Sequence, residues 1–137
     1  CPVRLIMYKG SCLCGDIRYE LHGELSAPRY CHCENCRTFS GTSPAAWAMA
    51  QQADLVVVDQ ESPVGEFNSG RGIRCFCSRC GSAVWFKSID FPDIVGIPLG
   101  CLDSGDIPEP QMHLWFDAKP TWCAVHDNKP KHAQGPE

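Results

Sequence analysis

Seven cysteines of the chain are spaced as metal ligands are. Three of them fall within one stretch, Cys31-His32-Cys33-Glu34-Asn35-Cys36, and the other four form the pairs Cys12-Leu13-Cys14 and Cys77-Ser78-Arg79-Cys80. Four thiolates close a tetrahedral structural zinc site, whereas a zinc ion with three protein ligands keeps one position open for a substrate. The seven cysteines therefore predict one closed zinc site for the fold and one open zinc site for function.

The three clustered thiols can surround one ion from a single local segment. In an extended chain residues two apart point to the same side, so Cys31 and Cys33 can present their sulfur atoms together while His32 faces away. The two-residue gap between Cys33 and Cys36 is typical of a tight turn that wraps a metal. We therefore assign Cys31, Cys33 and Cys36 to the open site.

The two outlying pairs then form the closed site. Cys12 and Cys14 share one side of an extended segment, and Cys77 and Cys80 are followed by Gly81, the glycine expected in a zinc-knuckle turn. A site built from these four thiols joins segments about sixty residues apart, which strongly constrains the unfolded chain. Its predicted role is structural.

The remaining cysteines leave alternatives open. Cys75 lies two residues before Cys77, so it could complete the open site or replace a ligand in the closed one. We interpret Cys75, Cys101 and Cys123 as ordinary semi-buried thiols, because free cysteine is among the residues most often buried. Cys77 and Cys80 also match the spacing of a thioredoxin-like redox pair, but no βαβ pattern surrounds them.

An open zinc site with three thiolates has a definite chemical preference. Zinc with three thiolates carries a net charge of about −1, so it draws less electron density from a fourth ligand than zinc held by three histidines. Such a soft site favours exchange of its fourth ligand for an incoming thiol, held as the nucleophilic thiolate. The expected chemistry is attack of a small thiol on a reactive carbon, or the reverse cleavage of a carbon–sulfur bond. If His32 or Cys75 supplies the fourth ligand instead, the second zinc has only a structural role and holds a loop in place.

Composition limits the class of protein. The chain has 137 residues, 44% hydrophobic and 20% charged, as in one globular domain, and its net charge of −4 offers no basic surface for nucleic acid or an anionic membrane. We find neither an apolar run long enough to span a bilayer nor the charged and apolar regions of a secretory signal. We therefore expect a reducing, cytoplasmic location, where clustered cysteines bind metal more often than they form disulfides.

The elements that must position these thiols are short. Eleven prolines and twelve glycines punctuate the chain, which predicts many short strands and no long helix. Residues 35–41 have the composition of a turn, residues 69–72 that of a hairpin turn, and residues 103–110 that of a loop. Residues 55–58 are predicted to form a buried strand because of their β-branched content. Further strand candidates are residues 17–21, 30–33, 44–50, 73–77, 83–86, 93–99 and 112–116.

We interpret residues 7–128 as a single zinc-binding β domain. Met7-Tyr8-Lys9-Gly10 is typical of a natural start, so we interpret residues 1–6 as an upstream remnant. From Asn128 onward the chain offers little to bury, and residues 129–137 are therefore expected to be a frayed tail.

Several motifs connect the chain to a known family. They are Gly10-Ser11-Cys12-Leu13-Cys14-Gly15, Cys31-His32-Cys33-Glu34-Asn35-Cys36-Arg37, Phe76-Cys77-Ser78-Arg79-Cys80-Gly81-Ser82, Met112-His113-Leu114-Trp115 and the later Trp122. In these features, which run from about Tyr8 to Asp127, the chain resembles the glutathione-dependent formaldehyde-activating enzyme family, also called the centromere protein V family.

The resemblance implies a mainly β fold of short antiparallel strands, the zinc-stabilised β-tent. It also implies the ligands of two zinc ions: Cys12, Cys14, Cys77 and Cys80 for a structural zinc, and Cys31, Cys33 and Cys36 for a second zinc whose fourth position is available to glutathione. The implied activity is that of a zinc-dependent carbon–sulfur lyase acting on small thiol–aldehyde adducts, which condenses glutathione with formaldehyde to S-(hydroxymethyl)glutathione. The alternative is a zinc-stabilised binding module in which both metals are structural.

Other side chains have two interpretations each. His113 could act as an acid or base on the hemithioacetal oxygen, but a single histidine in an alternating strand is more often a hydrogen-bonded structural residue. Arg37 and Arg74 could attract glutathione carboxylates or could be exposed surface cations. Six aromatic residues could wall a pocket over the zinc or fill the core: Phe39, Trp47, Trp85, Phe86, Trp115 and Trp122.

Overall fold

Short strands make up most of the regular structure within residues 5–135, which the computed structural model describes. One set of strands comprises β1 (Tyr8–Ser11), β2 (Arg18–Leu21), β5 (Leu55–Val57) and β10 (Leu102–Ser104). A larger set comprises β3 (Ser26–Cys31), β4 (Ala45–Gln51), β6 (Val64–Asn68), β7 (Gly72–Cys77), β8 (Ala83–Ser88), β9 (Ile94–Pro98) and β11 (His113–Leu114). The helical elements are α1 (Glu34–Ser40) and the 3-10 helices η1 (Gln52–Asp54), η2 (Leu99–Cys101) and η3 (Phe116–Ala118).

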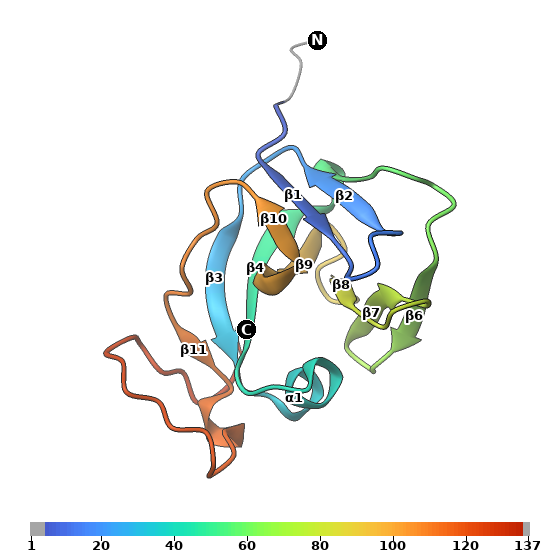
Figure 1. Ribbon diagram of the computed structural model, residues 1–137. Coiled ribbons are helices and arrows are strands. Elements are labelled where there is room, and N and C mark those ends of the chain that lie inside the picture. Colours follow the sequence, from blue (N-terminus) through green and yellow to red (C-terminus); the bar gives the residue numbers. More distant parts are fainter. Residues whose placement is uncertain (1–4, 136–137) are drawn as a thin grey trace.

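The strands form two sheets. The smaller sheet has the order β10-β1-β2-β5, and the larger has the order β11-β3-β4-β9-β8-β7-β6. Neighbouring strands are antiparallel except β11 and β3, which run parallel. Figure 1 shows the smaller sheet at one end of the molecule and α1 at the other, with the larger sheet between them. The prediction of a mainly β fold with antiparallel strands is thus confirmed.

The main core lies between the two sheets. Tyr19 and Leu21 of β2 point inward together, as residues two apart in a strand do, and Ile17 precedes them. They belong to one cluster with Val84 of β8 and Ile97 of β9, and all five side chains are almost completely buried. Burial of each such aliphatic side chain stabilises the fold by about 1.5 to 3 kcal/mol. The alternating pattern at residues 17–21 therefore identified a strand that holds the sheets together.

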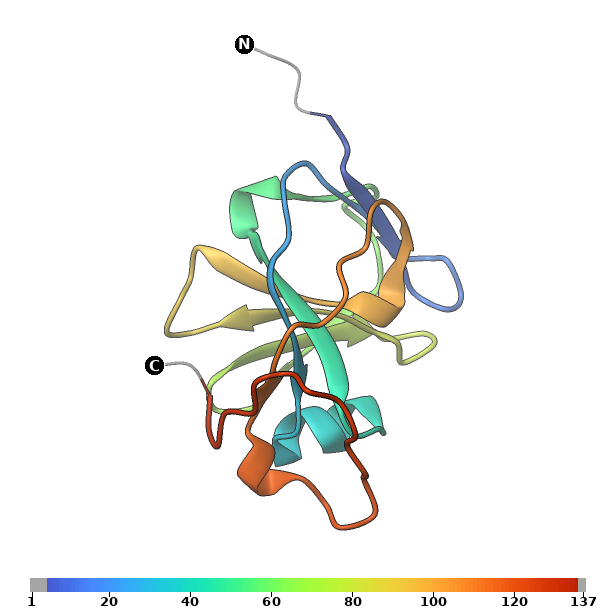
Figure 2. The ribbon, with the colours of Figure 1, turned by 90° about the vertical axis from the view of Figure 1, so that its left-hand side faces the viewer.

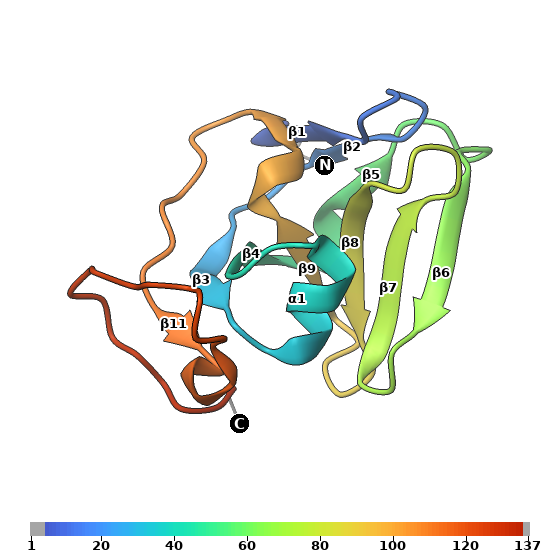
Figure 3. The same cartoon turned by 60° about the horizontal axis from the view of Figure 1, so that its bottom comes forward.

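Residues 35–41 form a helix and not the predicted turn. Helix α1 begins at Glu34, directly after Cys33, whose sulfur accepts a hydrogen bond from the Cys36 N–H at 3.3 Å. This bond satisfies one of the free N–H groups of the first helical turn, a task that serine or aspartate usually performs. The helix ends at Ser40, and Gly41 caps it with a left-handed φ of 69° that glycine adopts without strain. Figure 3 shows α1 in front of the middle strands of the larger sheet.

Residues 55–58 do not form a buried strand. Strand β5 lies at an edge of the smaller sheet, where it pairs with β2. Val56 is 43% exposed and Val58 is 58% exposed. A run of β-branched residues favours a strand because these side chains fit a pleated sheet. It does not require that both faces of the strand are buried. The prediction of burial at this position was therefore wrong.

Backbone hydrogen bonds join the described part of the C-terminal segment to β11 and η3. The His113 N–H donates to the Pro130 carbonyl, and the His132 N–H donates to the His113 carbonyl, each at 2.8 Å. The Phe116 N–H also donates to the His132 carbonyl at 3.0 Å, and Figures 1 and 2 both show the red segment beside the orange part of the chain around β11. Backbone hydrogen bonds hold these residues in place, and an argument from apolar burial could not detect them. A frayed tail over residues 129–137 stays a prediction, and these hydrogen bonds argue against it for the described part.

Some predictions concern the ends of the chain. Residues 1–4 and 136–137 lie outside the described residues, so the upstream remnant and the last part of the tail stay predictions. The domain bounds 7–128 also stay a prediction. The longest helix within residues 5–135 is α1, with seven residues, and no helix there is long and apolar enough to cross a bilayer.

Candidate metal centres and the adjoining cavity

Four sulfur atoms meet where the turn after β1 approaches the turn after β7. The Sγ atoms of Cys12, Cys14, Cys77 and Cys80 all lie within 4.8 Å of one another. The Cys14 Sγ atom is 3.6 Å from that of Cys12 and 3.7 Å from that of Cys77. Sulfur atoms placed tetrahedrally at about 2.3 Å from a zinc ion stand about 3.8 Å apart. The observed spacing therefore fits a four-thiolate zinc site.

The two turns that carry these thiols are built alike. The glycine after each cysteine pair has a left-handed conformation, with φ of 83° at Gly15 and 81° at Gly81. A side chain at either position would strain the backbone, so the glycines let each turn fold back sharply. The Leu13 N–H donates to the Ser82 Oγ atom at 2.9 Å, which links one turn to the other directly. The expectation of a turn glycine at position 81 is confirmed.

Three further sulfur atoms meet at the start of α1. Cys31 ends β3, Cys33 caps α1, and Cys36 lies in its first turn. Their Sγ atoms all lie within 4.8 Å of one another, and no other cysteine, histidine or carboxylate of residues 5–135 joins the group. A helix start, and not a tight turn, places Cys33 and Cys36. The structure thus brings both predicted sets together, as two clusters that could hold metal ions.

The three thiols at α1 cannot all ionise without a cation. Hydrogen bonds with Cys31 and Cys36 lower the pKa of Cys33 to about 2, whereas the hydrogen bond with Cys33 raises the pKa of Cys31 far above its usual range. Ionisation of one of these thiols therefore disfavours ionisation of its neighbours, because like charges repel at this distance. A bound divalent cation removes this conflict, because it stabilises every coordinating thiolate. The donor set thus fits zinc.

Neither alternative ligand joins the three-thiol cluster. His32 is fully buried and faces away from it, with its Nε2 atom 2.8 Å from the Nδ1 atom of His113. Cys75 is fully buried in the core between the sheets, and burial raises the pKa of its thiol to about 11. The thiols of Cys101 and Cys123 donate to backbone carbonyl groups. All three remaining cysteines thus resemble the semi-buried thiols that we expected.

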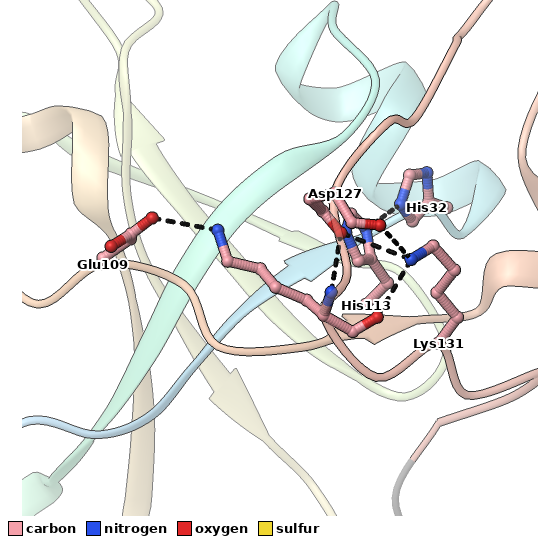
Figure 4. Close-up of polar contacts among 6 residues, drawn as sticks. His32, Glu109, His113, Asp127 and Lys131 are labelled. Carbon is pink, nitrogen blue, oxygen red and sulfur yellow. Dashed lines mark hydrogen bonds and ion pairs between the residues drawn. The ribbon is translucent and has the colours of Figure 1, made fainter.

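Hydrogen bonds connect Asp127, His113 and His32 in a row, and His32 lies between Cys31 and Cys33 in the sequence (Figure 4). A carboxylate can only accept, so Asp127 accepts from the His113 Nε2–H at 2.9 Å, and His113 Nδ1 in turn accepts from the His32 Nε2–H. Asp127 also accepts from the Lys129 N–H and from Lys131 Nζ. Principally because of the hydrogen bond from His113, the pKa of Asp127 is lowered to about 2. This row of side chains anchors His32, and with it the turn that carries two of the thiols.

Replacing Asp127 with asparagine is expected to lower the free energy of unfolding by the same amount at about pH 5.5 and about pH 8. The pKa of Asp127 lies below its ordinary value of 3.8, so the carboxylate contributes its full stability above about pH 4 and loses it as the pH falls toward about 2. Urea denaturation of both proteins at the two pH values measures the difference. Glu109→Gln is the control, because that carboxylate is 73% exposed and pairs with Lys129 Nζ at 3.0 Å, away from His113. A difference that changes between the two pH values would contradict the assignment of the effect to the Asp127 carboxylate.

A cavity of about 670 Å³ opens over the three-thiol cluster, and Cys31, Cys33 and Cys36 are all part of its lining. A narrower pocket of about 130 Å³ shares Cys31 and Cys36 with it and is otherwise lined mainly by apolar residues, among them Trp47 and Leu114. Cavities of about 300 to 1,000 Å³ are typical of small-molecule sites. The cluster is therefore accessible to a ligand of moderate size.

The predicted aromatic residues divide between the two interpretations. Phe86 and Trp115 line the larger cavity, and Trp47 lines the narrower pocket. Trp85 is 4% exposed in the core between the sheets, whereas Trp122 is 68% exposed. Three of the six side chains can thus contact a ligand beside the sulfur atoms. The other three, Trp85, Trp122 and Phe39, line neither space, and the ring of Phe39 packs against Phe76.

Charged side chains of both signs line the larger cavity: Arg29, Arg71, Arg74, Glu34 and Asp90. Sequence reasoning selected Arg74 but not Arg29 or Arg71. Arg29 lies two residues before Cys31 in β3, so strand alternation places it on the same face and could have identified it. Arg71 lies in the hairpin turn between β6 and β7, where strand alternation gives no such signal. Arg37 does not line the cavity, and Arg74 is buried, not an exposed cation.

Known proteins are similar to this chain in sequence. The family described as "Glutathione-dependent formaldehyde-activating enzyme" matches residues 7–118. A protein of Halomonas elongata, named "Putative glutathione-dependent formaldehyde-activating enzyme", is 29% identical over 133 residues, which cover 90% of this chain and 84% of that protein. An uncharacterized lyase of Schizosaccharomyces pombe is 31% identical over 80 residues, which cover 58% of this chain and 56% of the yeast protein.

A solved structure shares the fold. The crystal structure of a Rhodobacter sphaeroides protein aligns with a TM-score of 0.60 at 27% identity, over 72% of this chain and 90% of that one. The family match spans far more than half of the chain and includes both cysteine clusters. The protein therefore belongs to the glutathione-dependent formaldehyde-activating enzyme family, as its motifs predicted.

Proposed function

We propose that the protein is a zinc-dependent carbon–sulfur lyase that joins glutathione and formaldehyde as S-(hydroxymethyl)glutathione. The single observation that carries the proposal is the cluster of three thiols, which has no fourth ligand among residues 5–135 and opens into a cavity of about 670 Å³. Membership of the family and the name of the Halomonas elongata relative support the same reaction. The proposed zinc ligands are Cys12, Cys14, Cys77 and Cys80 at a structural site, and Cys31, Cys33 and Cys36 at the reactive site.

The residues around the reactive site have separate tasks. A zinc ion with three thiolate ligands supplies a fourth position where an incoming thiol is held as its nucleophilic thiolate. The three sulfur atoms supply the negative donors, and the Cys36 N–H that donates to Cys33 Sγ favours the charged form of that thiol. Trp47, Phe86 and Trp115 form apolar walls that limit access of water to the sulfur atoms.

The charges of the cavity match those of glutathione. This tripeptide carries two carboxylates and one ammonium group in addition to its thiol. Arg29 and Arg71 line the cavity and can pair with the carboxylates, while Glu34 and Asp90 can pair with the ammonium group. We therefore propose that the charged ends of glutathione lie along the cavity walls and that its thiol reaches the three cysteines.

The reaction is an addition in which no atom is lost. The glutathione sulfur forms a bond to the formaldehyde carbon, the carbonyl π bond breaks, and the oxygen takes up one proton, in balance with the proton that the thiol gives up. The reverse reaction breaks the same carbon–sulfur bond, which defines a lyase. His113 is 1% exposed and hydrogen-bonded at both ring nitrogens, so we assign it a structural role.

X-ray absorption at the zinc edge tests the proposal. Adding glutathione to the zinc-loaded protein is expected to raise the mean number of sulfur ligands per zinc toward four, because a thiolate joins the reactive site. S-methylglutathione is the matched control, since its blocked sulfur carries no thiolate, and it should leave the spectrum unchanged. If glutathione leaves the mean number of sulfur ligands per zinc unchanged, the result would favour the alternative, a binding module with two structural zinc ions.

We also infer a reducing, cytoplasmic location. The ten cysteines within residues 5–135 are all free thiols, including the closely spaced pairs. Such thiols persist in the cytosol, whereas an oxidising compartment would convert exposed ones to disulfides. The negative net charge of −4 adds no support for a nucleic-acid partner.

A further inference from the structure

Arg74 makes an uncommon set of contacts beside the three-thiol cluster. It lies on β7 and is only 7% exposed. Its Nη1 and Nη2 atoms both donate to the Cys36 sulfur, at 3.8 and 3.7 Å, and its Nε atom donates to the Ser69 Oγ atom at 3.3 Å. The guanidinium carbon lies 5.4 Å from the ring centre of Phe39 and 4.9 Å from that of Phe86. The two aromatic rings thus hold the cation against one metal-site sulfur.

The positive charge of Arg74 has no carboxylate partner. Within residues 5–135 no aspartate or glutamate forms an ion pair with it. A buried cation is costly unless an opposite charge compensates it, and aromatic faces compensate only a part. The negative charge that the guanidinium faces is therefore that of the cysteine cluster.

We propose that Arg74 is a positioning residue that neutralises the reactive site through Cys36 so that an anionic thiolate can enter. The inference rests on the proposed function. Three thiolates and a zinc ion carry about −1 in total, and this charge would repel an incoming thiolate. Arg74 brings the total to about zero. Arginine suits the position because it stays charged at every relevant pH and stacks on aromatic rings.

This role differs from recognition of a substrate carboxylate. A carboxylate clamp uses the guanidinium fork, and here both terminal nitrogens of the fork already face the Cys36 sulfur. Arg74 should therefore assist every thiol to the same extent, whether or not that thiol carries a carboxylate. Arg29 and Arg71, by contrast, line the cavity without contacting a sulfur atom in this way and suit the carboxylates.

The test measures thiol binding to the cobalt-substituted protein by the thiolate-to-cobalt absorption bands, which need no turnover. Wild-type protein, Arg74→Met and Arg74→Lys are each titrated with glutathione and with 2-mercaptoethanol, which has no carboxylate. In Arg74→Met we expect both dissociation constants to rise by the same factor, at least about tenfold. In Arg74→Lys we expect a smaller rise for both, since the charge remains but the fork is lost.

Arg37→Met is the matched control. It removes the same charge one residue from Cys36, but its side chain does not line the cavity, so both dissociation constants should stay within about twofold. Cobalt content and melting curves establish that each variant is folded, and Arg74→Lys keeps the test valid if Arg74→Met does not fold. A loss confined to glutathione, or no loss for either thiol, would overturn the inference and leave the proposed function standing. A wild-type spectrum that responds to neither thiol would instead overturn the proposed function.

Discussion

Replacing Cys36 with alanine is expected to remove about one of two bound zinc ions and to lower glutathione-dependent turnover by more than about 100-fold. Changes in residues that only orient a metal ligand already cost about 10- to 100-fold, so the loss of a ligand should cost more. The fold is expected to survive, because Cys36 lies outside the core between the sheets. Zinc content, turnover and a thermal melt followed by circular dichroism measure the three effects.

Two further variants separate the possible causes of that loss. Cys33→Ser keeps a side-chain oxygen that can cap α1 but removes the thiolate, so it isolates the loss of a ligand and leaves the Arg74 contact with Cys36 in place. Cys123→Ala removes a buried thiol outside both clusters and should keep both zinc ions. Unchanged turnover in Cys36→Ala would contradict the proposed role of the cluster.

Replacing Cys77 with serine is expected to prevent stable folding. A domain of this kind is stable by only about 5 to 15 kcal/mol, and a structural zinc site can contribute about 10 to 16 kcal/mol at neutral pH. Cys77 is fully buried at the end of β7, and its cluster joins the turn after β1 to the turn after β7. We expect a low zinc content and no cooperative thermal transition, measured by metal analysis and differential scanning calorimetry.

Cys75→Ala is the matched control for this second prediction. Cys75 is equally buried and lies two residues away on the same strand, but it belongs to neither cluster. Its replacement should cost about 1 to 2 kcal/mol for the small cavity that it leaves, with both zinc ions retained. The opposite outcome, in which Cys75→Ala loses zinc and Cys77→Ser keeps it, would show that our ligand assignment is wrong.

The gathering of the thiols could be predicted from the sequence because most of the information is local. Cys33 and Cys36 are close along the chain, and any compact turn brings their sulfur atoms near each other. We inferred by elimination that the two cysteine pairs distant in the sequence share one metal site. The structure places their four sulfur atoms together. The hairpin turn at residues 69–72 was equally readable, since glycine and serine mark it, and it joins β6 to β7.

What could not be predicted depends on partners distant in the sequence. Arg74 gave no sign of its contact with Cys36, because the contact exists only when β7 passes α1. Residues 35–41 lacked a recognisable cap, since a cysteine sulfur takes the place of the usual oxygen at Cys33. The anchoring of His32 needed His113 and Asp127, which both lie far from it along the chain. In each case tertiary contacts outweigh local propensity.

The route of the last described residues bears on how the protein can be handled in the laboratory. Gly135 is part of the cavity lining, and it packs so closely on Trp115 that it has no room for a side chain. A label attached at residue 135 would therefore displace Trp115 and stand beside the cavity, where it would compete with ligands. Strand β1 lies at the opposite end of the molecule from α1 (Figure 1), so a label on the exposed Lys9 of β1 would stay far from the cavity.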